Sequence, residues 1–163
     1  MNPAIPMNLK DEIKRAITSH YKTLNANFPE GNFYGYSLYT SDDVSSIDPV
    51  ANRESSISVD KDDPSYNYYR YSPDEWSDWD DYGKFDYVNL IIKKFGQLKS
   101  AILQQAFQAL IELESEGLFG IKSDSRFIVI WLSDSDNEII HISAKQLNSE
   151  KVYLEFASEF MTE

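Results

Sequence analysis

The feature that most constrains the fold of this chain is an apolar run at residues 127–132, FIVIWL. A nearly continuous run of this length is typical of a β-strand that is covered on both faces. Residues 9–27, 84–95 and 98–113 instead carry apolar side chains at three- and four-residue spacing, which predicts helices. We therefore expect a sheet with helices packed against it.

Two further strands and a hairpin are expected from residue type and turn chemistry. Residues 33–40, FYGYSLYT, and residues 66–71 are rich in aromatic and β-prone side chains, which predicts strands. A short helical turn is expected at Pro73. The polar residues 134–137, DSDN, predict a hairpin turn from the apolar run into another strand at 138–143.

The order of these elements predicts the fold class. A last helix is expected after Ser149, which is a suitable N-cap residue. Because a hairpin joins the closing strands and no regular βαβ alternation appears, we predict a single α+β domain over residues 1–163, with a mostly antiparallel sheet packed by helices. Residues 41–65 are expected to form an irregular loop region with a short element near residues 47–53.

The composition is strongly acidic. Twenty-seven Asp and Glu residues against 15 Lys and Arg residues give a formal net charge of −12. A charge of this sign repels phosphate backbones and speeds association with basic proteins. We therefore expect no nucleic-acid binding and a positively charged protein as the partner.

The chain has no cysteine, which excludes disulfides and thiolate metal sites and fits a reducing cytoplasm. Its first residues, MNPAIPMNLKDE, lack the basic and long apolar regions of a signal peptide. No apolar run approaches the roughly 18 to 20 residues that span a bilayer. We expect a bacterial, cytoplasmic protein without a membrane segment.

Motifs for catalysis, metals or cofactors do not emerge from the sequence. His20 and His141 lie on an apolar helix face and inside a predicted strand, where structural roles are expected. A calcium loop starting at Asp134 would place Ile139 and Lys145 where glycine and glutamate are required. The six glycines form no phosphate-binding motif. We predict no catalytic residue, no metal and no cofactor.

Residues 66–86, YNYYRYSPDEWSDWDDYGKFD, combine many rings with dense carboxylates. Such a segment favours an interaction surface, because the acids keep the rings in contact with water or with a cationic partner. Two alternatives remain: a solvated cover whose rings pack on the core, and a glycosidase-type carboxylate pair flanked by Trp76 and Trp79. The residues predicted to bind a partner are Asp74, Glu75, Trp76, Asp78, Trp79, Asp80, Asp81 and Tyr82.

The blocks FYGYSLYTSDDVSSIDPVANRE at residues 33–54 and YYRYSPDEWSDW at 68–79, with the following FDYVNLII, resemble a bacterial family with a domain of unknown function, DUF4303. The recurring features are an aromatic strand before a "YT-D" turn, an "AN-E" segment and a "YRYSP-EW" block. The acidic residues after Trp76 are not a fixed part of that pattern. The resemblance implies an immunity protein of a bacterial polymorphic toxin system, which binds and neutralises a cognate toxin domain.

These observations give three functional hypotheses. The first is a non-enzymatic immunity protein whose acidic, aromatic surface binds a basic toxin domain. The second is a small-molecule or glycan-processing enzyme with a pocket around Arg70 and Glu75. The third is an acidic soluble domain without a toxin partner. Asn52, Glu54 and Arg70 are expected to form either a pocket or a buried structural network.

Overall fold

The computed structural model describes residues 8–30 and 32–160. Its centre is a four-stranded sheet with the strand order β3-β2-β1-β4. Strands β1 and β2 are antiparallel, β2 and β3 are antiparallel, and β1 and β4 are parallel. The predicted α+β class with a mostly antiparallel sheet is therefore confirmed. The strands are β1 Phe33–Ser41, β2 Asp48–Arg53, β3 Asp78–Trp79 and β4 Phe127–Ser133.

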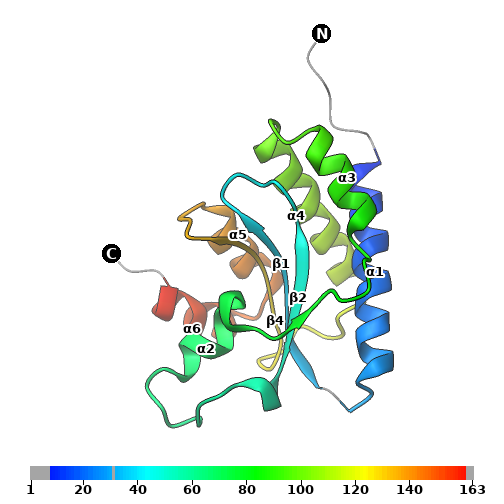
Figure 1. The fold of residues 1–163 in the computed structure, drawn as a ribbon. Helices are drawn as coiled ribbons and strands as arrows, with labels where there is room; N and C mark the ends of the chain where they lie inside the picture. The colour runs from blue at the N-terminus through cyan, green and yellow to red at the C-terminus, as the bar shows by residue number, and fades with distance from the viewer. Residues whose placement is uncertain (1–7, 31, 161–163) are drawn as a thin grey trace.

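Helices lie on both faces of the sheet (Figure 1). One face is covered by α1 Leu9–Asn27 and α4 Lys99–Ser115, with α3 Asp86–Lys94 packed against α1. On the other face lie α2 Tyr66–Tyr71 and α6 Glu150–Phe160, and α5 Ile139–Leu147 runs along β4. Two short 3₁₀ turns, η1 Glu54–Ser56 and η2 Pro73–Glu75, complete the described chain.

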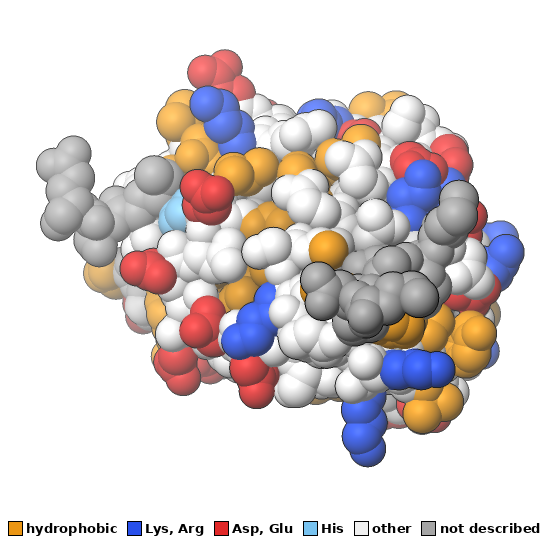
Figure 2. All heavy atoms as spheres, turned by 90° about the horizontal axis from the view of Figure 1, so that it is seen from above, with side chains coloured by type: hydrophobic (Ala, Val, Ile, Leu, Met, Phe, Trp, Pro, Cys, Tyr) orange, Lys and Arg blue, Asp and Glu red, His pale blue; other side chains and the backbone are white. Residues whose placement is uncertain are grey.

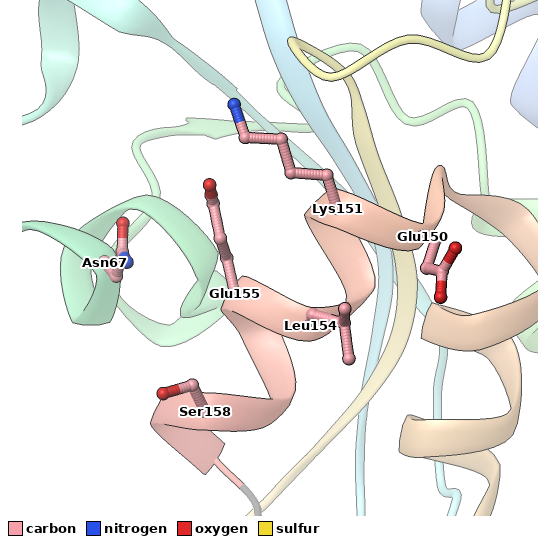
Figure 3. Close-up of a pocket in the computed structure, with 6 residues that line it drawn as sticks. All are labelled: Asn67, Glu150, Lys151, Leu154, Glu155 and Ser158. Carbon is pink, nitrogen blue, oxygen red and sulfur yellow. The ribbon is translucent and has the colours of Figure 1, made fainter.

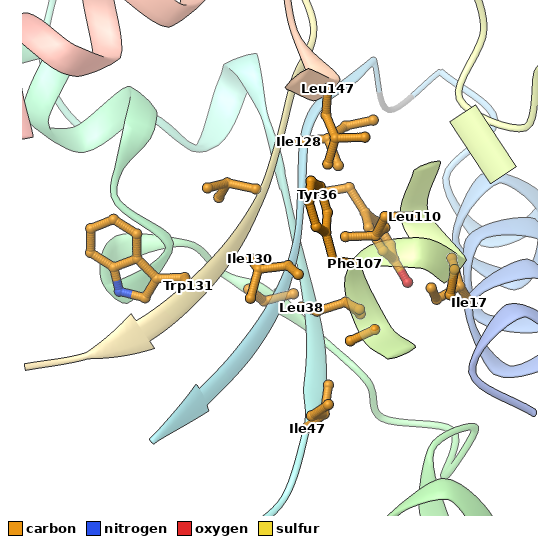
Figure 4. Packing of buried hydrophobic residues seen from close by; sticks show 14 of the residues in the cluster. Ile17, Tyr36, Leu38, Ile47, Phe107, Leu110, Ile128, Ile130, Trp131 and Leu147 are labelled. Carbon is orange, nitrogen blue, oxygen red and sulfur yellow. The ribbon is translucent and has the colours of Figure 1, made fainter. Parts of the chain in front are cut away.

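The apolar run at 127–132 forms β4, and all of its side chains are buried, as predicted. The side chains of β4 point alternately toward the helices on one face of the sheet and those on the other, because successive residues of a strand point to opposite faces. Figure 4 shows Ile128 and Ile130 on the side of Tyr36 and Leu110, while Trp131 points the other way. The helices predicted around residues 9–27, 84–95 and 98–113 are also present as α1, α3 and α4.

Residues 66–71 form a helix, α2, and the predicted strand there is wrong. A segment of six residues is too short to show a helical period in its apolar positions. The strand prediction therefore rested on the β propensity of the aromatic side chains. In the structure, Arg70 and Tyr71 face the core on consecutive positions of the helix. The outer edge of β2 is occupied instead by the two residues of β3.

Residues 138–143 lie in and just before helix α5, so the predicted hairpin and closing strand are wrong. The buried residues Ile139, Ile140, Ser143, Ala144 and Leu147 follow a helical spacing. Strand β4 pairs with β1 instead, in parallel, and its other edge faces α5.

Side chains from α5 and its C-cap bond the backbone at this outer edge of β4. The side chain of Asn148 accepts the Ile128 N–H at 2.8 Å and donates to the Ile128 carbonyl oxygen at 2.7 Å. The Oγ atom of Ser143 accepts the Ile130 N–H at 3.0 Å. A buried sheet edge needs such partners, because unpaired backbone groups are costly away from water.

Within the described residues, none of the helices has the length and apolarity required to cross a membrane.

Candidate functional site

Residues 74–82, named here the acidic segment, cross the β2 edge of the sheet. The chain leaves α2, passes in front of the sheet and continues toward α1 and α3 (Figure 1). Pairing of Trp79 with Val50 and of Asp78 with Ala51 holds the middle of the segment against β2. The backbone of the segment is therefore fixed to the sheet at its centre.

Trp76 is buried, so its predicted role as an exposed anchor is wrong. Its side chain is 3 % exposed, and Nε1 donates a hydrogen bond to the Arg70 carbonyl oxygen at 3.1 Å. The indole meets the rings of Tyr34 and Phe127 edge-on. The turn at Pro73 directs this ring inward, and burial of its large apolar surface is favourable because the N–H group has a partner.

Trp79 and Tyr82 remain at the surface, as expected for anchors. Trp79 is 36 % exposed, and its ring centroid lies 5.1 Å from that of Tyr39 in an edge-on contact. Tyr82 is 42 % exposed, and its hydroxyl accepts a hydrogen bond from Asn27 Nδ2 at 2.6 Å. Each ring is supported on one side and open on the other, which suits a contact with a partner.

Two carboxylates of the segment have structural partners. Asp78 accepts two hydrogen bonds from Arg53, from Nε at 3.0 Å and from Nη2 at 3.2 Å. Asp80 accepts the backbone N–H groups of Tyr82 and Phe85 at 3.0 and 3.2 Å, and so shapes the turn before α3. These two acids are less available for a partner than the sequence indicated.

Asp74, Glu75 and Asp81 are exposed. The hydroxyl of Tyr39 donates to Asp74 Oδ1 at 2.5 Å, and that of Tyr68 donates to Glu75 Oε1 at 3.2 Å. Burial, the bond to Asp74 and the charges of Asp74 and Asp134 raise the pKa of Tyr39 to about 12. The acidic segment thus presents negative charge beside exposed rings.

Further acids that the sequence reasoning did not single out gather at one end of the sheet. Because β1 and β4 are parallel, the loops that follow both strands meet there, and Ser135 Oγ donates to Asp42 Oδ1 at 2.8 Å. Seen from above, acidic side chains lie along one side of this end (Figure 2). The exposed acids of the two loops are Asp42, Asp43, Asp134, Asp136 and Glu138. The sequence signal was present as SDD and SDSDNE, each directly after a strand.

Asn52, Glu54 and Arg70 belong to one connected network. Asn52 Nδ2 donates to the Tyr34 hydroxyl at 2.9 Å, and this hydroxyl donates to the Arg70 carbonyl oxygen at 2.7 Å. The Arg70 guanidinium lies 4.2 Å above the Tyr34 ring and donates to Glu54 Oε2 at 2.7 Å. Asn52 Oδ1 also accepts the hydroxyl of Ser77 at 3.3 Å. The network ties the acidic segment and α2 to β1 and β2.

Arg70 and Glu75 do not share a pocket. Arg70 lines a hollow between α2 and α6, together with Glu54 and Lys151, whereas Glu75 and Asn52 are not among the residues that line it. His20 is fully buried, and its Nδ1 lies 2.9 Å from the Tyr36 hydroxyl. In the described part of the chain, no cluster of three or more His, Cys, Asp or Glu residues is arranged to hold a metal ion.

The fold and this surface define an α+β protein that presents acids and rings at one sheet edge. A family model described as "Domain of unknown function (DUF4303)" matches residues 13–149. The chain therefore belongs to the DUF4303 family, in agreement with the resemblance noted from its sequence blocks. No curated protein and no solved structure is similar enough to match this chain.

Proposed function

We propose that this protein is a non-enzymatic immunity protein that binds and neutralises a basic toxin domain in the cytoplasm. The observation that carries the proposal is the juxtaposition of Trp79 and Tyr82, both exposed, with the exposed acids Asp74, Glu75 and Asp81 on one segment. The immunity role itself comes from the family resemblance. The surface supports it by offering the two kinds of contact that a cationic partner requires.

Charge is expected to control the rate of association. The protein has a formal net charge of −12, and acids from the loops after β1 and β4 extend the negative surface toward Asp74. Complementary charge raises the association rate constant and makes it depend on salt. Toxins that act on nucleic acids need basic surfaces to hold phosphates, so they are suitable partners.

Exposed rings are expected to control the lifetime of the complex. Trp79 is held by Tyr39 and by its pairing with β2, so little conformational entropy is lost when a partner covers it. Trp and Tyr side chains are frequent among the residues that dominate binding energy. Trp79 is therefore the main anchor, and Tyr82 is a second one.

The test begins with the proteins encoded next to this chain's gene. Each is co-expressed with this protein and copurified, and the binding kinetics of the recovered complex are then measured at low and high salt. A triple variant, Glu75→Gln, Asp81→Asn and Asp134→Asn, is expected to slow association at low salt by about tenfold. Asn is suitable at position 134, because Asp134 has a φ of 52° and Asn tolerates that region.

A matched control separates local charge from net charge. The variant Asp60→Asn, Asp62→Asn and Glu150→Gln removes the same charge from exposed acids in the loop before α2 and at the start of α6, outside the acidic segment (Figure 1). It is expected to change the association rate much less than the first variant. Equal effects of the two variants would contradict a localised docking surface.

The anchor is tested separately. Replacing Trp79 with Ala is expected to raise the dissociation rate by roughly thirtyfold, which corresponds to about 2 kcal/mol. The Leu154→Ala variant removes an apolar side chain that is even more exposed, from α6, and is expected to leave the complex unchanged. An unchanged dissociation rate for the Trp79 variant would remove this residue from the interface.

A further inference from the structure

Helix α3 presents a pair of apolar side chains on its outer side. Its inner residues Val88 and Ile92 are buried in the core, on the side of α1, whereas Tyr87 is 57 % and Leu90 is 66 % exposed. The two exposed side chains are three positions apart, so they are neighbours on the helix surface. Figure 1 shows α3 on the outside of the molecule, next to α1. The outer face of α3 is therefore open to a partner.

This pair differs from the exposed apolar side chains elsewhere on the surface. A single one is ordinary, and Leu154 on α6 is an example, since the other residues that line its shallow pocket are polar or charged (Figure 3). Tyr87 and Leu90 instead continue a series that begins with Trp79 and Tyr82. Residues 79–90 contain four of the seven large apolar side chains that are exposed in the described chain. Such a concentration indicates a contact surface.

Asn89 fixes α3 beside the strand that holds the acidic segment. Its side-chain oxygen accepts the Ile47 N–H at 2.8 Å, and its amide group donates to the Ile47 carbonyl oxygen at 3.0 Å. Ile47 directly precedes β2, and Val50 of that strand pairs with Trp79. The outer face of α3 and the acidic segment are therefore held next to the same strand.

The carboxylates between these apolar side chains are not neutralised. Desolvation raises the pKa of Asp48, and the negative charges of Asp80 and Asp86 raise it further, which places the three groups near one another. Among the described residues, no Lys or Arg forms an ion pair with any of the three. Lys93 and Lys94 lie in the last turn of α3, at its other end. A cation at the beginning of α3 would relieve the repulsion between the carboxylates.

We propose that the outer face of α3 is a second part of the docking surface, which receives a cationic amphipathic segment of the toxin domain. Apolar side chains of that segment cover Tyr87 and Leu90, and its Lys or Arg side chains pair with Asp81 and Asp86. This inference rests on the proposed function and names the kind of partner segment that the surface fits. A second copy of this chain is a poor occupant, because its net charge of −12 would bring like charges together.

The first experiment does not require the toxin. Its probe is a synthetic peptide of leucine and lysine residues at helical spacing, and the control peptide has glutamine in place of every leucine at the same charge. Backbone amide shifts of the full chain are followed by NMR during each titration. The leucine peptide is expected to cause saturable shifts at residues 80–94, and the glutamine peptide is expected to bind about tenfold more weakly, because it buries less apolar surface.

Variants of α3 locate the binding. The double variant Tyr87→Ser and Leu90→Ser is expected to weaken binding of the leucine peptide about tenfold. Ile142→Ser removes an exposed apolar side chain from α5, which lies along β4 at the other edge of the sheet, and is expected to leave the affinity unchanged. All three replaced side chains are exposed, so the amide spectra of the variants are expected to remain those of the folded protein.

The complex with the toxin separates this inference from the proposed function. There the α3 double variant is expected to raise the dissociation rate about tenfold. A dissociation rate that rises in Trp79→Ala but not in the double variant would overturn the inference and leave the proposed function intact. Saturable binding of the leucine peptide at α3 without a complex with any neighbouring gene product would contradict the proposed function and still support α3 as a docking surface.

Two further results would overturn the inference. The first is equal binding of the leucine and glutamine peptides, or no saturable shift at α3 with either. The second comes from sedimentation of the free protein: a dimer that forms with rising concentration and is lost in the α3 double variant would assign this face to a second copy of the chain.

Discussion

The indole of Trp76 lies directly against Gly35, so that a Cβ atom at position 35 would be 2.7 Å from Cη2 of the ring. Gly35 sits beside an irregularity in the pairing of β1 with β2. The absence of a side chain there makes room for the buried tryptophan. This contact joins the first strand to the turn that begins the acidic segment.

Gly35→Ala is therefore expected to lower the free energy of unfolding by about 1–3 kcal/mol, because a side chain is forced into a filled core. Urea denaturation measures this change. In a Trp76→Leu background the same substitution is expected to cost less, since the ring atoms that clash are absent. Gly96→Ala, where the nearest atom is 3.4 Å away, serves as the control. Additive costs of the Gly35 and Trp76 substitutions would contradict the contact.

Asn148→Ala is expected to destabilise the protein by about 3 kcal/mol, because it leaves buried backbone groups of Ile128 and Ala144 without partners. Hydrogen exchange at the Ile128 amide is expected to become faster. Asn25→Ala removes an exposed bond to the Tyr21 carbonyl oxygen and is expected to change stability by less than about 0.5 kcal/mol. Similar effects of the two substitutions would show that Asn148 does not support the edge of β4.

Stability is expected to decrease as the pH falls because of His20. Burial lowers the pKa of His20 to about 4, whereas an unfolded histidine titrates near 6.5. The unfolded chain therefore binds the proton first, and roughly 3 kcal/mol of stability is lost as the pH falls from about 6.5 to about 4. Above about pH 6.5 the His20 ring is neutral in both the folded and the unfolded chain, so it does not lower the stability.

Imidazole C–H signals in NMR spectra report the His20 titration, and urea denaturation across the same pH range reports stability. His20→Gln is expected to remove the part of the pH dependence of the free energy of unfolding that corresponds to uptake of about one proton. The part that comes from the carboxylates remains in both proteins. Parallel stability curves for the two proteins, or a His20 midpoint near that of an unfolded histidine, would refute the prediction.

Asp78 and Asp81 are expected to behave differently although they are close in sequence. Asp78 is paired with Arg53 and half-buried, so Asp78→Asn is expected to lower stability by about 1–2 kcal/mol. Asp81 is exposed, so Asp81→Asn is expected to leave stability nearly unchanged and to slow association with a basic partner. Thermal unfolding and association kinetics of the two variants check this. A loss of stability in Asp81→Asn but not in Asp78→Asn would mean that the ion pair between Arg53 and Asp78 is not maintained in solution.

Part of the candidate site was readable from the sequence. Trp79, Tyr82 and the acids of residues 74–82 stand out in the sequence as a dense group, because they are neighbours along the chain. The sequence did not show which of the two tryptophans is exposed, because Trp76 and Trp79 have similar neighbours in sequence although Trp76 is buried and Trp79 is exposed. Position 76 is buried by Gly35, Tyr34 and Phe127, which are far away in sequence.

The sequence by itself determined the elements whose signal is local: the helices around residues 9–27 and 98–113, the buried strand at 127–132 and the acidic charge. Only the tertiary structure decided that β4 lies parallel to β1, and that α5 takes the position at the edge of β4 where a hairpin strand was expected. The reason is physical. The spacing of apolar residues shows which side of a helix or strand is buried. It does not show which other element packs against that side. Packing and hydrogen bonds between distant residues decide that, such as those between the Asn148 side chain and the Ile128 backbone.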